Sequence, residues 1–289
     1  MPLTHRPYRD DADLMLLLHW LSSHAPETFM HPGDLVWWLR QNTLVDPAQA
    51  LDLFFDGDAL QGFAYSDSGW AVLQGLPQLP DEVWDAIVAQ VASETAGKLT
   101  VQPHEWDTAQ VAALTRAGLR PTDNRMLRLV RLTEPTDLEA VNLPAGFRFA
   151  DMHSGEIGAE ARVQIHQDVW HPSKVTLEAY QRLQAAPLYR ADLDVMVVAP
   201  TGELAAYALG WYDPASATGL MEPVGTRASF RRQGLGRRLI REITRRLAAL
   251  GARKVTIGTY EKNGAATALY QSAGYRPSGF WVDYKRPSE

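Results

Sequence analysis

The chain has 289 residues, no cysteine and a formal net charge of -6. Its length allows one large domain or two domains of ordinary size, each with a buried core. The missing cysteine excludes disulfides, thiolate nucleophiles and cysteine-ligated zinc sites. The acidic balance argues against nucleic acid or an anionic membrane as a partner, because both attract broad basic surfaces.

The first residues lack the apolar core of a signal peptide, and no apolar run approaches the roughly 20 residues that span a bilayer. We therefore expect a cytoplasmic protein with no membrane partner.

The N-terminal half is predicted to alternate helices with strands. Helices are expected at 12–23, 81–92 and 108–117, and strands at 51–55, 60–65, 70–73, 99–102 and 125–131. Trp37 and Trp38 stand beside Leu35 and Leu39, which favours a helix packed on the sheet over a binding surface. Between the third strand and the next helix, residues 75–80 contain two prolines. Because proline lacks a backbone N–H, this segment is not expected to bind an anion.

A polar segment bracketed by Pro135 and Pro144 is the clearest linker candidate. We place one domain at 1–134, the linker at 135–145 and a second domain at 146–289. In the second domain we expect helices at 160–170, 176–183, 236–250 and 265–273, and strands at 147–149, 194–199, 204–212, 220–224, 254–260 and 280–284. The strands from 194 to 224 are expected to be consecutive and antiparallel. The predicted fold class is α/β in the α+β sense, with mostly antiparallel sheets flanked by helices.

Residues 231–236 form a glycine-containing loop before an amphipathic helix. A diphosphate site needs converging backbone N–H groups, glycines that allow close approach, and the positive end of a helix. This segment supplies all three, and its arginines add charge-assisted donors. A nucleoside-triphosphate loop would need Gly-Lys-Ser/Thr where Gly236-Arg237-Arg238 stands, and a dinucleotide fingerprint would need a third glycine at Leu239. Both alternatives are disfavoured.

With this loop, the chain closely resembles the GCN5-related N-acetyltransferase (GNAT) superfamily. The family motif is Gln or Arg, two residues, Gly, one residue, then Gly or Ala, and Arg231, Gly234 and Gly236 match it. A second family hallmark is matched downstream by Asn263, Ala266, Leu269, Tyr270, Gly274 and Tyr275. The resemblance covers about residues 145–287 well, and residues 1–133 only in the order of elements. The arrangement is similar to that of tandem acetyltransferases of the mycothiol synthase type, with a degenerate first domain that lacks the pyrophosphate loop.

The resemblance implies acetyl-coenzyme A (acetyl-CoA) as co-substrate. No metal site is expected, because the sequence contains no metal-ligand spacing. It implies that the strand entering the loop splays open near Val224, Gly225 and Thr226, and Gly225 would suit a β-bulge. The cofactor-binding residues expected from it are Val224, Gly225, Thr226, Arg231, Arg232, Gln233, Gly234, Leu235, Gly236, Arg237, Asn263 and Tyr270.

Two residues are the candidates for catalysis. Glu222 lies two residues before Val224 and is the best-placed carboxylate for a general base, although it could also be an ordinary strand glutamate. Tyr270 matches the family tyrosine that protonates the departing thiolate, and its alternative role is helix packing. Asn263 would serve as a cofactor contact, a helix cap or both.

Acceptor contacts are predicted from aromatic and histidine residues at element ends: Trp170, His171, Trp211, Tyr212, Tyr260 and Trp281. The expected acceptor is a small-molecule amine, and the protein is expected to be a monomer or homodimer. Two alternatives stay open. One is a non-catalytic acyl-CoA sensor or interaction module, and the other is a peptide or protein N-acetyltransferase.

Overall fold

The computed structural model describes residues 3–25, 28–94 and 99–287. Its N-terminal half contains the elements β1 (Thr4–Pro7), α1 (Asp11–Ser23), α2 (Pro32–Arg40), α3 (Pro47–Ala50), β2 (Leu51–Asp56), β3 (Ala59–Asp67), β4 (Trp70–Gly75), α4 (Asp81–Glu94), β5 (Thr100–Val101), α5 (Thr108–Arg116) and β6 (Arg120–Leu132). The C-terminal half contains β7 (Arg148–Asp151), α6 (Ala159–Val169), α7 (Leu177–Gln184), β8 (Asp194–Val198), β9 (Leu204–Asp213), β10 (Thr218–Thr226), α8 (Leu235–Ala249), β11 (Lys254–Tyr260), α9 (Gly264–Ser272) and β12 (Arg276–Lys285).

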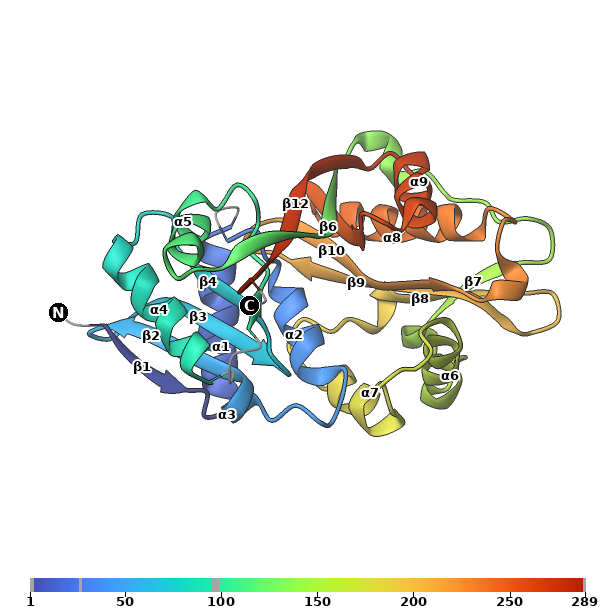
Figure 1. Cartoon of the computed structure of the whole chain (residues 1–289). Coiled ribbons are helices and arrows are strands. Elements are labelled where there is room, and N and C mark those ends of the chain that lie inside the picture. Colours follow the sequence, from blue (N-terminus) through green and yellow to red (C-terminus); the bar gives the residue numbers. More distant parts are fainter. Residues whose placement is uncertain (1–2, 26–27, 95–98, 288–289) are drawn as a thin grey trace.

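The strands form one twelve-stranded sheet in the order β1-β2-β3-β4-β5-β12-β6-β11-β10-β9-β8-β7. Among the described strands only the pairs β4–β5 and β10–β11 are parallel. Helices flank this sheet on both sides (Figure 1). The predicted α+β fold class with mostly antiparallel pairing is confirmed.

The two halves exchange strands at the centre of the sheet. β6 of the N-terminal half pairs with β11, and β12 of the C-terminal half pairs with both β5 and β6. Figure 1 shows β6 and β12 crossing together between the two lobes. A domain boundary at residues 135–145 remains a prediction. The strands before and after this segment belong to one hydrogen-bonded sheet.

Helix α8 covers one face of the C-terminal part of the sheet. Leu239, Ile243 and Leu247 recur every four residues along α8, on the helix face that the sequence predicts to be apolar, and all three are fully buried. They belong to a core cluster with Val195 on β8 and Ile257 on β11. The cluster holds the N-terminal end of α8 at the edge of the sheet where β10 ends.

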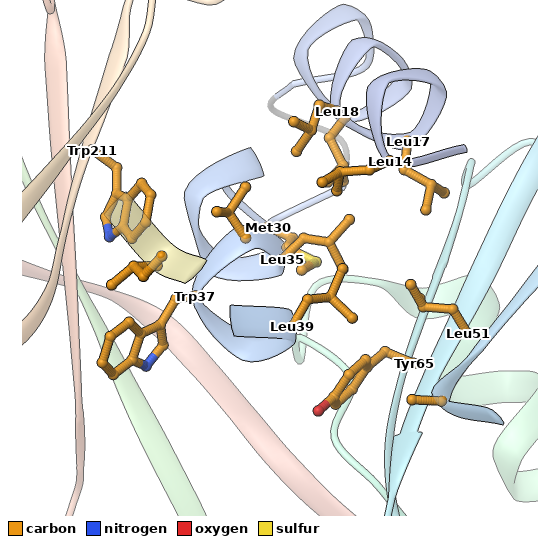
Figure 2. Packing of buried hydrophobic residues seen from close by; sticks show 14 of the residues in the cluster. Leu14, Leu17, Leu18, Met30, Leu35, Trp37, Leu39, Leu51, Tyr65 and Trp211 are labelled. Carbon is orange, nitrogen blue, oxygen red and sulfur yellow. The ribbon is translucent and has the colours of Figure 1, made fainter. Parts of the chain in front are cut away.

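Helix α2 lies between the lobes on the other face of the sheet and connects them. Leu35 and Leu39 pack toward α1 and the N-terminal strands, whereas Trp37 lies on the side of Trp211 from β9 (Figure 2). The predicted packing of a helix at Trp37 is confirmed, because this side chain is buried in the core. The position of α2 brings its N-terminal turn against β10.

Most predicted elements occur within a few residues of the expected bounds. The exceptions are β1 and α3, which have four residues each and were not predicted. Elements this short carry too few apolar repeats to produce a periodic signal. In the described residues, no helix has both the length and the apolar character needed to cross a bilayer.

Candidate active site

A cavity of about 990 Å³ lies on the face of the sheet that α2 covers. It extends from the start of α8 to the N-terminal lobe, so both halves of the chain line it. The sheet contributes Trp70 and Gln74 from β4, Trp281 from β12, Arg128 from β6 and Thr256 from β11. A single cavity therefore joins the predicted diphosphate loop to residues of the N-terminal half.

The loop before α8 has the backbone geometry of an anion site. Gly234 is the N-cap residue of α8 with φ of +74°, and no side chain caps this helix end. Arg232 also has positive φ, so backbone groups of the loop turn toward a common side. Arg231, Arg232 and Arg237 line the cavity, and in the described part of the chain none of them forms an ion pair. The start of α8 thus presents N–H groups that no described side chain caps, and the loop before it and the first turn together place three arginines at the cavity.

β10 separates from β11 just before this loop. The two strands pair from Thr218 to Met221 on β10, and β10 then continues only with β9. An irregularity in the β9–β10 register lies between Met221 and Val224. The bulge predicted at Gly225 is therefore at Glu222 and Pro223 instead. Gly225 is required for another reason, because a Cβ there would lie 2.6 Å from Tyr207 and 2.7 Å from Val169.

Glu222 lines the cavity where the two strands separate. Burial raises its pKa well above the ordinary glutamate value, and the charge of Asp34 and a hydrogen bond with Asp34 raise it further. Asp34 comes from α2 in the N-terminal half and lines the same cavity. Burial also raises the pKa of Asp34, whereas its hydrogen bonds with Glu222 and the His31 N–H lower it. The site therefore contains two carboxyl groups in contact, one from each half.

The N-terminal turn of α2 explains how Asp34 reaches Glu222. The His31 side chain caps the helix, and the His31 N–H donates to the Asp34 carboxylate at 2.9 Å. His31 Nε2 lies 3.3 Å from the Thr218 carbonyl oxygen on β10. Trp211 Nε1 donates to the Glu222 carbonyl oxygen at 2.8 Å. A Cβ at Gly33 would lie 2.5 Å from Trp211, so only glycine allows this approach.

Tyr270 on α9 also borders the cavity and is 7 % exposed. Burial, and then the charge of Glu222, raise its pKa to about 12. No described residue hydrogen-bonds its hydroxyl group. Asn263 lines the cavity and caps α9, because its Oδ1 accepts from the Ala266 N–H at 3.2 Å. A neutral phenol is thus available close to the carboxyl pair.

Two cations line the same face of the sheet. Burial lowers the pKa of Arg128 on β6, while the charge of Asp34 raises it. Burial lowers the pKa of Lys254 on β11, and the charge of Arg128 lowers it further. Neither residue forms an ion pair within 4 Å in the part of the chain that the structure describes. Arg128 thus places a positive charge near Asp34.

The predicted cofactor residues are largely brought together. All of them line the cavity except Gln233, whose side-chain amide donates to the Ser229 carbonyl oxygen at 3.4 Å. The acceptor candidates divide into two groups. Trp170, Tyr260 and Trp281 line the cavity.

The other three acceptor candidates do not line the cavity. Trp211 is fully buried in the core, and His171 is exposed outside the cavity. Tyr212 packs against the core cluster beneath α8. Position at the end of an element did not separate cavity residues from other residues. For Trp211 and Tyr212, the face of the strand on which each stands decides which way the side chain points.

Several cavity residues were not predicted, and most come from the N-terminal half: Asp34, Trp38, Trp70, Gln74 and Gln102, together with Arg128 and Lys254. An aspartate in the first turn of a helix is expected as a capping residue, so Asp34 carries no separate signal. The partner of its other oxygen becomes apparent only when α2 is placed on β10.

The fold and the site together define a two-lobed α+β protein in which an uncapped helix end with arginines beside it lines a large cavity. Residues 160–275 match the Acetyltransferase (GNAT) family, so this part of the chain is similar to that family. GNAT proteins in general are acyl-CoA-dependent N-acetyltransferases that use acetyl-CoA and amine acceptors. The match over residues 160–275 supports N-acetyltransferase activity.

Solved structures share the fold over the whole chain. A tandem GNAT protein from the clavulanic acid biosynthesis pathway is 16 % identical, with 100 % of each chain covered and a TM-score of 0.69. A GCN5-related N-acetyltransferase from Sphaerobacter thermophilus is 16 % identical over 99 % of this chain and 97 % of its own, with a TM-score of 0.66. A GNAT-family acetyltransferase from Colwellia psychrerythraea is 14 % identical, with 98 % and 100 % covered and a TM-score of 0.66. No curated protein matches the chain.

Proposed function

We propose that the protein transfers an acetyl group from acetyl-CoA directly to the amine of a small molecule. The observation that carries the proposal is the single cavity that joins the start of α8 to Glu222 and Tyr270. A direct transfer needs the thioester and the amine in one enclosed space, and this cavity passes the gap between β10 and β11.

The residues at the loop fit a diphosphate. The uncapped N-terminus of α8 offers N–H groups at the positive end of the helix, and Arg231, Arg232 and Arg237 surround it. Acetyl-CoA, when bound, supplies the acetyl group as a thioester. Val224 and Thr226, on the part of β10 that has no β11 partner, would hold the arm that leads from the diphosphate to Glu222.

Glu222 and Tyr270 would handle the two protons that the amine loses. An alkylammonium has a pKa near 10, so it must lose a proton before it can attack a carbonyl carbon. Because the pKa of Glu222 is raised, its carboxylate is a stronger base than an ordinary glutamate. Tyr270, with a pKa of about 12, keeps its proton at neutral pH and can donate it to the departing thiolate. The second amine proton then restores the phenol.

Support for a small acceptor comes from the residues of the N-terminal half that line the cavity. Trp38 on α2 and Trp70 on β4 are among them, and their rings lie 5.4 Å apart at 83°. A peptide acceptor would need an open groove at this position. The carboxyl groups of Asp34 and Glu222 favour an acceptor that enters as a cation.

The proposal is tested by thiol release from acetyl-CoA over a panel of small amines and short peptides. We expect turnover with at least one small amine. In Tyr270→Phe we expect kcat to fall at least tenfold while the Kd for CoA changes less than twofold, because in the proposed mechanism the phenol would serve the departing sulfur and not the diphosphate. Tight CoA binding by the wild type with no acceptor in any class would contradict the enzymatic proposal and support a sensor.

A further inference from the structure

We propose that Asp34 of the N-terminal half and Glu222 of the C-terminal half act as one acid–base unit, which binds the ammonium group of the acceptor and accepts its proton. This inference rests on the proposed acetyl transfer to an amine. It assigns a direct role in the reaction to the half of the chain that lacks the diphosphate loop.

The first support is the way the fold delivers Asp34 to this position. Two contacts hold α2 on the sheet: the His31 ring on the Thr218 carbonyl of β10, and Gly33 against the Trp211 ring of β9. Trp211 in turn donates to the Glu222 carbonyl oxygen and so ties β9 to β10 at this position. Asp34 follows Gly33 directly, so its side chain is set beside Glu222 by packing and not by a flexible loop. Two carboxyl groups in direct contact are otherwise unfavourable, because both cannot be ionised without repulsion.

The second support is the charge around the pair. Arg128 on β6 faces Asp34, and Lys254 on β11 lies on the same face of the sheet. His31 has a pKa lowered to about 4 by burial and is neutral, and Tyr270 on α9 is neutral as well. Arg128 therefore favours ionisation of Asp34, and Glu222 keeps the shared proton. We therefore assign the pair one shared proton and one negative charge in the state that receives the acceptor.

This arrangement solves a difficulty that Glu222 alone would have. The raised pKa that makes the Glu222 carboxylate a stronger base also favours its protonated form, which cannot accept another proton. The carboxylate of Asp34 supplies the missing base. The N–H bond of the ammonium breaks and an O–H bond forms within the pair, which leaves a neutral amine and a neutral carboxyl pair. Release of one proton to water returns the pair to its single negative charge.

Asp34→Asn tests the inference because asparagine can still accept from the His31 N–H, so the start of α2 is preserved. The matched control is Asp46→Asn. Asp46 caps α3 through the Ala48 N–H at 3.0 Å and does not line the cavity. Both variants are compared with the wild type by thermal unfolding, which must show an intact fold.

The first measurement is an NMR titration of the Glu222 carboxyl carbon in the protein without substrate. We expect the pKa of Glu222 to fall by at least one unit in Asp34→Asn and to stay unchanged in Asp46→Asn. The reason is that asparagine carries no charge and donates a hydrogen bond to the Glu222 carboxylate. An identical Glu222 titration in both variants would overturn the inference, whatever the enzyme activity.

The second measurement is the pH dependence of kcat/KM with the best amine from the panel. We expect kcat/KM at neutral pH to fall at least tenfold in Asp34→Asn, and its acid limb to move to higher pH, because Glu222 must then ionise by itself. A profile that superimposes on the wild-type profile would also overturn the inference. If the wild type itself transfers no acetyl group, the proposed function fails and the NMR result still decides whether the carboxyl pair exists.

Discussion

Replacement of Gly234 by aspartate tests whether the start of α8 binds the diphosphate. Gly234 has φ of +74°, and a Cβ there meets the guanidinium group of Arg238. A carboxylate placed at this N-cap would lie about 5 Å from a diphosphate bound at the helix end. At an effective dielectric constant of about 20, two unit charges at this separation repel by roughly 3 kcal/mol. That corresponds to a roughly 100-fold higher Kd for CoA.

The control for this experiment is Gly234→Asn. Asparagine is nearly isosteric with aspartate and shares the cost of positive φ, about 1 kcal/mol, but it adds no charge. Calorimetric titration with CoA should give a Kd within about fivefold of the wild type for asparagine and the large loss only for aspartate. Thermal unfolding of both variants checks the fold. If the two variants bound CoA equally well, the diphosphate would not lie at this helix end.

Three further results are expected. Asp194→Asn should destabilise the fold by roughly 3 kcal/mol in urea unfolding, because it removes the charge that pairs with fully buried Arg162 at 2.6 Å; the exposed control Asp192→Asn should cost less than about 1 kcal/mol, and equal losses would contradict the argument. Calorimetry should find one CoA bound per chain, whereas two would show that the N-terminal half also binds CoA. Residues 146–289 expressed alone should fail to give a cooperative unfolding transition, since β11 and β12 would both lose β6; a cooperative transition would show that the exchanged strand is dispensable.

The C-terminal fold was predicted well because its signals are local. The apolar residues of α8 repeat with helical spacing over fifteen residues, and the turn at 200–202 separates β8 from β9. The loop at 231–236 was also apparent, because a diphosphate site depends on consecutive residues. Glu222 stands shortly before the loop, and Tyr270 stands inside the second family motif. The structure brings both residues to one cavity.

The acceptor end could not be predicted, because it depends on which strands are neighbours. Arg128 and Gln74 reach one cavity only because β12 and β6 lie between β5 and β11. A linear division into two domains gives no indication of that exchange. The same limit applies to Trp211, whose position at the end of β9 suggested a pocket residue, although its ring packs beneath α2.

The strand exchange also explains why a half without a diphosphate loop can be required for function. If β6 and β12 each stayed in their own lobe, the two lobes would meet through side chains alone and could shift relative to each other. With the strands exchanged, backbone hydrogen bonds of one sheet fix the lobes, and α2 is held on β10. A contact between Asp34 and Glu222 requires carboxyl oxygens placed to within a few tenths of an ångström. The shared sheet supplies that rigidity, so the N-terminal half can contribute a charge to the site without binding CoA itself.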